Sequence, residues 1–185
     1  MGPPGDHKNF CEKIRNLVMD DRCKFFEFKL TKIVDGDSLA GDIGQGFSDF
    51  KTNQGIRLWS VDTNEIRRGR GRDAEDVQHG KMARDYLQGI LEVGEMYVIQ
   101  THEKESGKFG RWLITLWKGR LNVNKSLVRK HLAVKYSGGN KQELRAKHRK
   151  NICKLKQLGR WESYRVGNQT NKEWLREYET GVVKS

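Results

Sequence analysis

The spacing of apolar residues along the chain predicts a leading helix followed by a strand. Between about residues 6 and 21, four apolar residues recur at helical spacing, which predicts a short N-terminal helix. These residues are Phe10, Ile14, Leu17 and Val18. From Phe26 to Thr31 apolar and polar residues alternate, and this pattern predicts a strand that becomes irregular at Ile33.

Further elements follow from the same reasoning. Glycines at 41, 44 and 46 punctuate a polar stretch before a second predicted strand over residues 55–61, as in a hairpin or meander. Residues 67–79 are charged and typical of a loop, whereas residues 80–93 place apolar side chains on one helical face. The remaining predictions are strands over 96–101 and 111–117, a helix from about Asn122, a short strand over 133–136 and a helix from Asn140 to about Leu158.

This order of elements predicts an α+β fold. A run of five strands interrupted by one helix suits a five-stranded OB-like Greek-key β-barrel with three helices, with the short N-terminal helix before it and a C-terminal extension after it. Barrels of this kind commonly bind oligonucleotides on their faces and loops. Periodicity alone fits an open sheet equally well.

Composition narrows the class of protein. The 185 residues suffice for one hydrophobic core, and 35% hydrophobic residues exclude a disordered chain. The net charge of +12 and the pI near 9.7 favour a polyanionic partner such as nucleic acid, although many proteins are basic for solubility alone. Residues 140–160 carry eight Lys or Arg against one acid, which fits either a solvated helix face or one that faces phosphate.

The cysteines and the absence of long apolar runs bear on location. Cys11, Cys23 and Cys153 are odd in number and widely spaced, so we expect no disulfide partner and no zinc site. No membrane-spanning run is present and no signal peptide begins the sequence as given, which predicts an intracellular protein; a secreted one whose leader had been removed would read the same. A monomer is the default expectation, and the oligomeric state stays open.

Two short segments carry candidate chemistry. Asp35 and Asp37 flank a glycine at the end of a strand, where their oxygens can converge on a hard cation, although Asp-Gly is also a common hairpin turn with solvated acids. In the segment 57–65 a guanidinium precedes further oxygen ligands where the strand gives way to a loop. The residues concerned are Arg57, Asp62, Thr63 and Glu65. Alternatively, Arg57 pairs with an acid across the sheet and Glu65 is simply solvated.

A third segment, Lys108-Phe109-Gly110-Arg111, opens a strand with another guanidinium, which a surface ion pair would also explain. Together with Ile33-Val34-Asp35-Gly36-Asp37-Ser38 and the 56–65 segment, it resembles the three signature blocks of staphylococcal nuclease-like domains. The resemblance extends through 123–129 and 158–161. It predicts a nuclease-like domain over residues 23–161, between an N-terminal extension (1–22) and a C-terminal extension (162–185).

The resemblance also implies roles for individual residues. Calcium would be held by the carboxylates of Asp37 and Asp62 and the carbonyl of Thr63, with Asp35 acting from behind them. Arg57 and Arg111 would bind the scissile phosphate and Glu65 would contact an attacking water, so these three residues are the catalytic candidates. Lys108 and Tyr136 would contact substrate. The implied activity is calcium-dependent endonucleolytic hydrolysis of DNA, and also of RNA, with little sequence specificity and 3′-phosphate products.

Two positions depart from the family pattern, and one loop adds to it. Asn64 stands where the family usually has proline, which loosens the backbone that aims Glu65, and Phe109 replaces a tyrosine. The loop beside the candidate site carries four arginines, which either follow a sugar-phosphate backbone or form a disordered basic surface. They are Arg67, Arg68, Arg70 and Arg72. The alternative functions are a non-catalytic nucleic-acid-binding module and an assembly component that docks through its tail.

Overall fold

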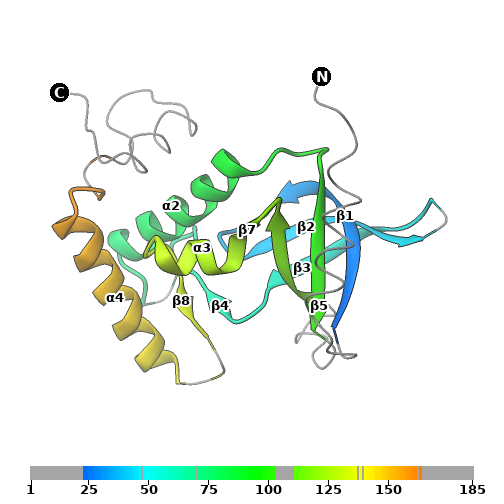
Figure 1. The fold of residues 1–185 in the computed structure, drawn as a ribbon. Coiled ribbons are helices and arrows are strands. Elements are labelled where there is room, and N and C mark those ends of the chain that lie inside the picture. The colour runs from blue at the N-terminus through cyan, green and yellow to red at the C-terminus, as the bar shows by residue number, and fades with distance from the viewer. Residues whose placement is uncertain are drawn as a thin grey trace. The chain divides into compact units, whose positions relative to one another are not determined.

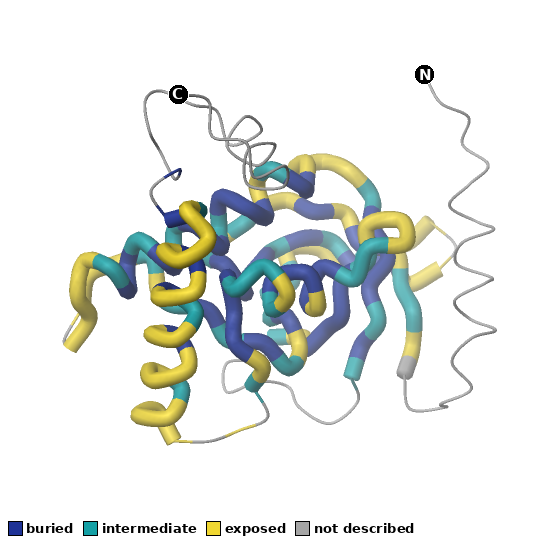
Figure 2. The backbone as a smooth tube through the Cα atoms, turned by 60° about the vertical axis from the view of Figure 1, so that its left-hand side comes forward, coloured by how far each residue is buried: buried dark blue, intermediate teal, exposed yellow. Residues whose placement is uncertain are grey.

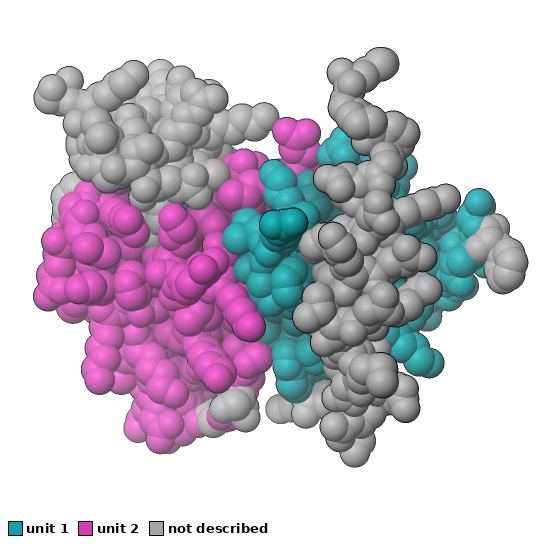
Figure 3. Space-filling view, in the orientation of Figure 1, with its two compact units in different colours: residues 1–32, 39–59, 93–124 teal, residues 33–38, 60–92, 125–185 magenta. Residues whose placement is uncertain are grey.

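A computed structural model describes residues 23–46, 48–69, 71–102, 111–136, 138, 140–161 and 163. The predicted N-terminal helix, most of the C-terminal extension, Lys108 and Arg70 therefore lie outside the described residues. The chain divides into two compact units, which are coloured separately in Figure 3. Unit 1 draws on residues 1–32, 39–59 and 93–124, and unit 2 on residues 33–38, 60–92 and 125–185.

The strands of unit 1 close into a five-stranded barrel (Figure 1). Its strands are β1 (Cys23–Ile33), β2 (Ser38–Gly46), β3 (Asp49–Leu58), β5 (Met96–His102) and β6 (Trp112–Lys118). They neighbour one another in the order β3-β2-β1-β5-β6, and a parallel pairing of β3 with β6 closes the ring. The short β7 (Leu121–Asn122) continues from β6 as an antiparallel partner. This arrangement confirms the predicted barrel.

The barrel interior is filled by alternate residues of these strands. In β3 and β6, Ile56, Leu58 and Ile114 are at most 1% exposed, as expected when every second side chain points inward. Figure 2 shows buried backbone running along the barrel strands. The residues between them, such as Arg57 and Leu113, therefore point their side chains outward from the barrel wall.

Unit 2 is built from helices and a second, two-stranded sheet. Its elements are β4 (Val61–Asp62), α2 (Ala74–Ile90), β8 (Val134–Lys135) and α4 (Lys141–Gln157), and α3 (Val123–Arg129) leads into it. Asn140 caps α4 by accepting a hydrogen bond from the N–H of Gln142, so the predicted start of this helix is confirmed. No helix among the described residues is long and apolar enough to span a bilayer.

Several predicted elements differ from those in the structure. Helix α2 begins at Ala74 instead of residue 80, because Asp73 caps it and exchanges hydrogen bonds with Asp76 in a capping box. Strand β3 ends at Leu58, before a turn in which Ser60 has a positive φ of 60°. The last short strand, β8, pairs with β4 and not with the barrel. Residues 41–46, interpreted as a punctuated stretch, belong to strand β2.

Candidate functional site

The acidic turn at residues 35–38 is tightly hydrogen-bonded. The N–H groups of Val34 and Asp35 both donate to the carbonyl of Ser38, at 2.9 and 3.0 Å, and the N–H of Gly36 donates to Asp35 Oδ1 at 2.8 Å. Asp37 is 4% exposed and accepts hydrogen bonds from Ser38 Oγ at 2.9 Å and from the N–H of Thr63 at 3.3 Å. Two of the residues predicted to bind calcium are thus brought together.

Asp35 carries an unfavourable charge in this turn. Its pKa is raised to about 6, mainly by burial and also by the nearby carboxylates of Asp37 and Glu65, against the opposing effects of the Gly36 N–H and Arg84. Mutual repulsion therefore contributes to the shift. A bound cation would relieve this repulsion, because it would offset the negative charges that face one another.

Asp62 is held by a histidine from α4. His148 is 2% exposed and its Nε2 lies 3.0 Å from Asp62 Oδ2. The other ring nitrogen, Nδ1, is buried and has no hydrogen-bond partner among the described residues. The His148 ring meets the ring of His79 edge to face, with centroids 5.6 Å apart. Sequence reasoning gave neither histidine a role at the site, since His79 closed a predicted loop and His148 lay among apolar residues on one stripe of the last predicted helix.

Asn64, which was expected to loosen the backbone before Glu65, has its side chain hydrogen-bonded to helix α2. Its Nδ2 lies 3.2 Å from His79 Nδ1, and His79 Nε2 lies 2.8 Å from the carbonyl of His131. Burial lowers the pKa of His79 to about 4, so the ring is neutral and donates from Nε2 while accepting at Nδ1. Gly80 completes the contact, because a Cβ there would lie 2.3 Å from the Asn64 carbonyl oxygen.

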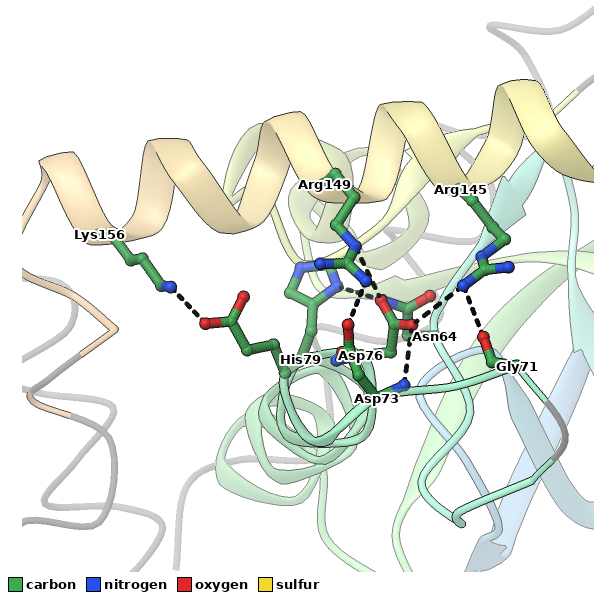
Figure 4. A network of polar contacts seen from close by, with 9 residues as sticks. Asn64, Gly71, Asp73, Asp76, His79, Arg145, Arg149 and Lys156 are labelled. Atoms are coloured by element: carbon green, nitrogen blue, oxygen red, sulfur yellow. Dashed lines mark hydrogen bonds and ion pairs between the residues drawn. The ribbon is translucent and has the colours of Figure 1, made fainter.

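The arginine loop and the first turn of α2 are held by cations of α4 (Figure 4). Arg145 donates to the carbonyl of Gly71 at 2.5 Å, Arg149 pairs with Asp73 and Asp76, and Lys156 pairs with Glu75 at 2.5 Å. Part of the basic face of α4 is therefore engaged with the acids of α2. Figure 2 shows that the rest of this helix is largely exposed.

Within the loop itself, Arg72 lies 3.7 Å from Glu65 as an exposed ion pair, and Arg67 and Arg68 are exposed. Such a pair contributes at most about 1 kcal/mol to stability. Tyr136, a predicted substrate contact, is half-buried, and its N–H donates to the carbonyl of Ser60 at 3.0 Å. Nothing described links its side chain to the acidic turn.

In unit 1, Arg57 lies on β3 and Arg111 directly precedes the neighbouring strand β6, and both side chains share the outward face. Arg57 is opposite Leu113 in the parallel pairing of β3 with β6, and Arg111 precedes Leu113 by two residues. The stem of Arg111 crosses β3 at Gly55, where a Cβ would lie 3.2 Å from Arg111 Cγ. Gly55 and Arg57 are also two residues apart, so the same face of the barrel carries both arginine side chains.

The donor set suits a hard divalent cation in its chemistry. Carboxylates and a backbone carbonyl are the oxygen ligands that calcium prefers. Among the described residues, however, no group of three or more His, Cys, Asp or Glu side chains is gathered closely enough to hold a metal ion. Calcium binding at Asp37, Asp62 and Thr63 therefore remains a prediction.

Comparison with known families adds a decisive observation. The sequence model of the family described as staphylococcal nuclease homologue matches residues 55–163, which is more than half of the chain. The chain belongs to the staphylococcal nuclease homologue family. A search of curated proteins found no match.

Membership of the staphylococcal nuclease homologue family accounts for the barrel with its helices, and it makes this chain a nuclease-like or nucleic-acid-binding module. The matched range includes Arg57, Asp62, Glu65 and Arg111, but it begins after the acidic turn and after β1 and β2. The predicted domain bounds of 23–161 are therefore still a prediction.

Proposed function

We propose that this protein is a calcium-dependent endonuclease that hydrolyses DNA and RNA with little sequence preference and leaves 3′-phosphate ends. The observation that carries the proposal is the hydrogen bond from the Thr63 N–H to Asp37 Oδ2, at 3.3 Å, which joins the acidic 35–38 turn to the segment that contains Asp62 and Glu65. Acids held together in a chain of net charge +12 are hard to explain by nucleic-acid binding alone, because carboxylates repel phosphates.

The roles of the residues follow from the charge of the reaction. A phosphodiester gains negative charge on its oxygens as water attacks, and this charge must meet fixed cations. Asp37, Asp62 and the Thr63 carbonyl would hold calcium, which supplies positive charge next to the phosphate. Arg57 and Arg111 would each present two parallel N–H donors to phosphate oxygens, an arrangement that lysine does not offer.

Glu65 is the candidate for orienting the attacking water and accepting its proton. The backbone at Glu65 is supported by its neighbours, since the Asn64 side chain is hydrogen-bonded to His79 and the 64–65 backbone packs on Gly80. Its exposed pair with Arg72 is weak enough to exchange for other partners. Asp35, behind Asp37 in the same turn, would set the charge of the metal site.

The decisive experiment incubates the protein with plasmid, single-stranded DNA and RNA in the presence of calcium, magnesium or a chelator. We expect degradation with calcium, none with chelator, and a loss of roughly a hundredfold or more in rate for Arg57→Ala and Arg111→Ala. Arg120→Ala, in the exposed turn between β6 and β7, is the matched control and should cleave normally. A parent protein that does not cleave, or arginine variants that cleave at the parent rate, would overturn the proposal.

A second candidate is a non-catalytic nucleic-acid-binding module. It is favoured by the finding that no three acidic, cysteine or histidine side chains of the described residues converge on one point. This candidate predicts salt-sensitive binding of DNA and RNA in chelator and no product after prolonged incubation with calcium. The same incubation series therefore separates the two functions.

A further inference from the structure

The outward barrel face that carries the two arginines continues across β6 to β5. Leu113 and Thr115 of β6 are two residues apart and so lie on the same face, and Thr115 is opposite Gln100 in β5. His102, two residues beyond Gln100, therefore has the same orientation. Arg57, Leu113 and His102 thus belong to one face that spans three neighbouring strands of unit 1.

Trp59 adds an exposed aromatic ring to this face. It follows Arg57 by two residues, directly after the end of β3. Trp59 is 37% exposed, although its ring stacks on the ring of His102 with centroids 4.9 Å apart and an interplanar angle of 18°. Because the two ring planes are nearly parallel, the stack presents a flat aromatic surface close to Arg57 in sequence and on the same face.

This surface is held rigidly. The N–H of Trp59 donates to the carbonyl of Ile114 at 2.7 Å, and its carbonyl accepts a hydrogen bond from Asn124 Nδ2 at 3.0 Å. His102 Nε2 lies 2.9 Å from Thr115 Oγ1, and burial lowers the pKa of His102, so its ring is uncharged at neutral pH. Both halves of the stack are therefore fixed before any ligand arrives, which lowers the entropic cost of binding a flat partner.

We propose that Trp59, supported by His102, is a stacking platform for an unpaired nucleobase next to the phosphate bound by Arg57 and Arg111. Aromatic rings stack on all bases with similar strength, so a platform of this kind needs no sequence preference. Bases within a duplex already stack on one another and do not offer a free face. The platform therefore selects single-stranded DNA or RNA as the substrate class. The inference rests on the proposed function for its substrate, but it concerns binding and not the metal.

The test measures affinity in chelator, so that no cleavage takes place. Labelled single-stranded DNA, the duplex of the same sequence, and an abasic strand of the same length are titrated with each variant, and anisotropy is recorded. Trp59→Ala should weaken binding of the single strand about tenfold and leave the duplex and the abasic strand nearly unchanged. Trp59→Phe, which keeps an aromatic face, should retain most of the affinity, and His102→Ala should weaken it less than Trp59→Ala.

The matched control is Trp112→Ala. Trp112 is exposed to a similar degree, at 38%, but it is opposite Ile56 and so has the other orientation on the strand pair. Its ring is occupied by Lys51 Nζ, 5.3 Å from the centroid, and its Nε1 donates to Gln54. We expect Trp112→Ala to show no selective loss for the single strand.

Each outcome decides the matter. Equal losses for the single strand and the abasic strand would mean that Trp59 only supports the arginines, and an equal effect of Trp112→Ala would mean that any exposed tryptophan suffices; either result overturns the platform. A protein that never cleaves but binds single strands through Trp59 refutes the proposed nuclease and keeps the platform. Calcium-dependent cleavage by the parent, together with unchanged single-strand binding by Trp59→Ala, refutes the platform and keeps the proposed nuclease.

Discussion

His148 Nε2 lies 3.0 Å from Asp62 Oδ2, and this contact joins helix α4 to a carboxylate predicted to bind calcium. The buried Nδ1 of His148 has no hydrogen-bond partner among the described residues, so a proton there would be unsatisfied at a cost of about 1–3 kcal/mol. Of the two ring nitrogens, Nε2 is therefore the one that donates a proton to Asp62. One oxygen of Asp62 is oriented by this bond, as expected for a ligand whose direction matters.

The first prediction concerns this bond. His148→Ala should weaken calcium binding by about tenfold or more, because the supporting donor is lost. His148→Gln, whose amide nitrogen can take the place of Nε2, should restore most of the affinity. Calorimetric titration of the protein with calcium measures both variants without substrate. Equal calcium affinity in the parent and His148→Ala would show that the contact serves folding alone.

A second prediction concerns stability in acid. His79 has a pKa of about 4 in the folded protein, below the ordinary value of 6.5, so the unfolded chain takes up the proton first. Its contribution to stability is complete above about pH 6.5 and is lost as the pH falls toward 4, by up to about 3 kcal/mol. Urea unfolding across this range measures the loss. His79→Gln should have a flatter profile; an identical slope would assign the acid sensitivity to other groups.

The third prediction concerns Asp35, whose effect on the change of stability with pH is opposite to that of His79. Its pKa is raised to about 6, so the folded protein holds this proton more tightly than the unfolded chain, and stability falls as the pH rises from about 4 to 6. In chelator at pH 8, Asp35→Asn should therefore be more stable than the parent by about 1–2 kcal/mol, after allowance for the partial exposure of the group. At pH 3.5 the two proteins should unfold alike. Thermal melts at both pH values test this, and a variant that is less stable at pH 8 would contradict it.

The arginine loop can be tested through salt. Replacing Arg67, Arg68, Arg70 and Arg72 with Gln should weaken nucleic-acid binding and flatten its dependence on salt concentration. The slope of log affinity against log salt should fall by about 0.7 to 0.9 for each phosphate contact that is lost. Calcium affinity should stay the same, since none of these residues is a predicted ligand. An unchanged salt slope would leave the loop without a role in binding.

The closure of the barrel followed from the number of strands and from the family resemblance, because periodicity fits an open sheet equally well. Local pattern predicted most of the barrel strands, since apolar and polar residues alternate along them. It was insufficient for the start of α2. Apolar periodicity there begins only at Val77, and the first turn is charged, so the helix depends on the cap at Asp73. The pairing of β4 with β8 was also missed, since two-residue strands carry no period of their own.

The acidic turn and the 57–65 segment were identified from residue types and order, and the hydrogen bond from Thr63 to Asp37 is consistent with that grouping. The supporting histidines were not identified. His148 and Asp62 are 86 residues apart in sequence, and the partner of Asn64, His79, comes from a helix that was expected to start after it. Contacts of this range are set by how the elements pack, which no local spacing records.

Three of the eight cations in residues 140–160 are engaged by the start of α2. Adding up basic residues along α4 thus overstates the attraction that a strand of DNA or RNA would feel there. Any backbone phosphate that approached Arg149 would compete with a carboxylate already in place.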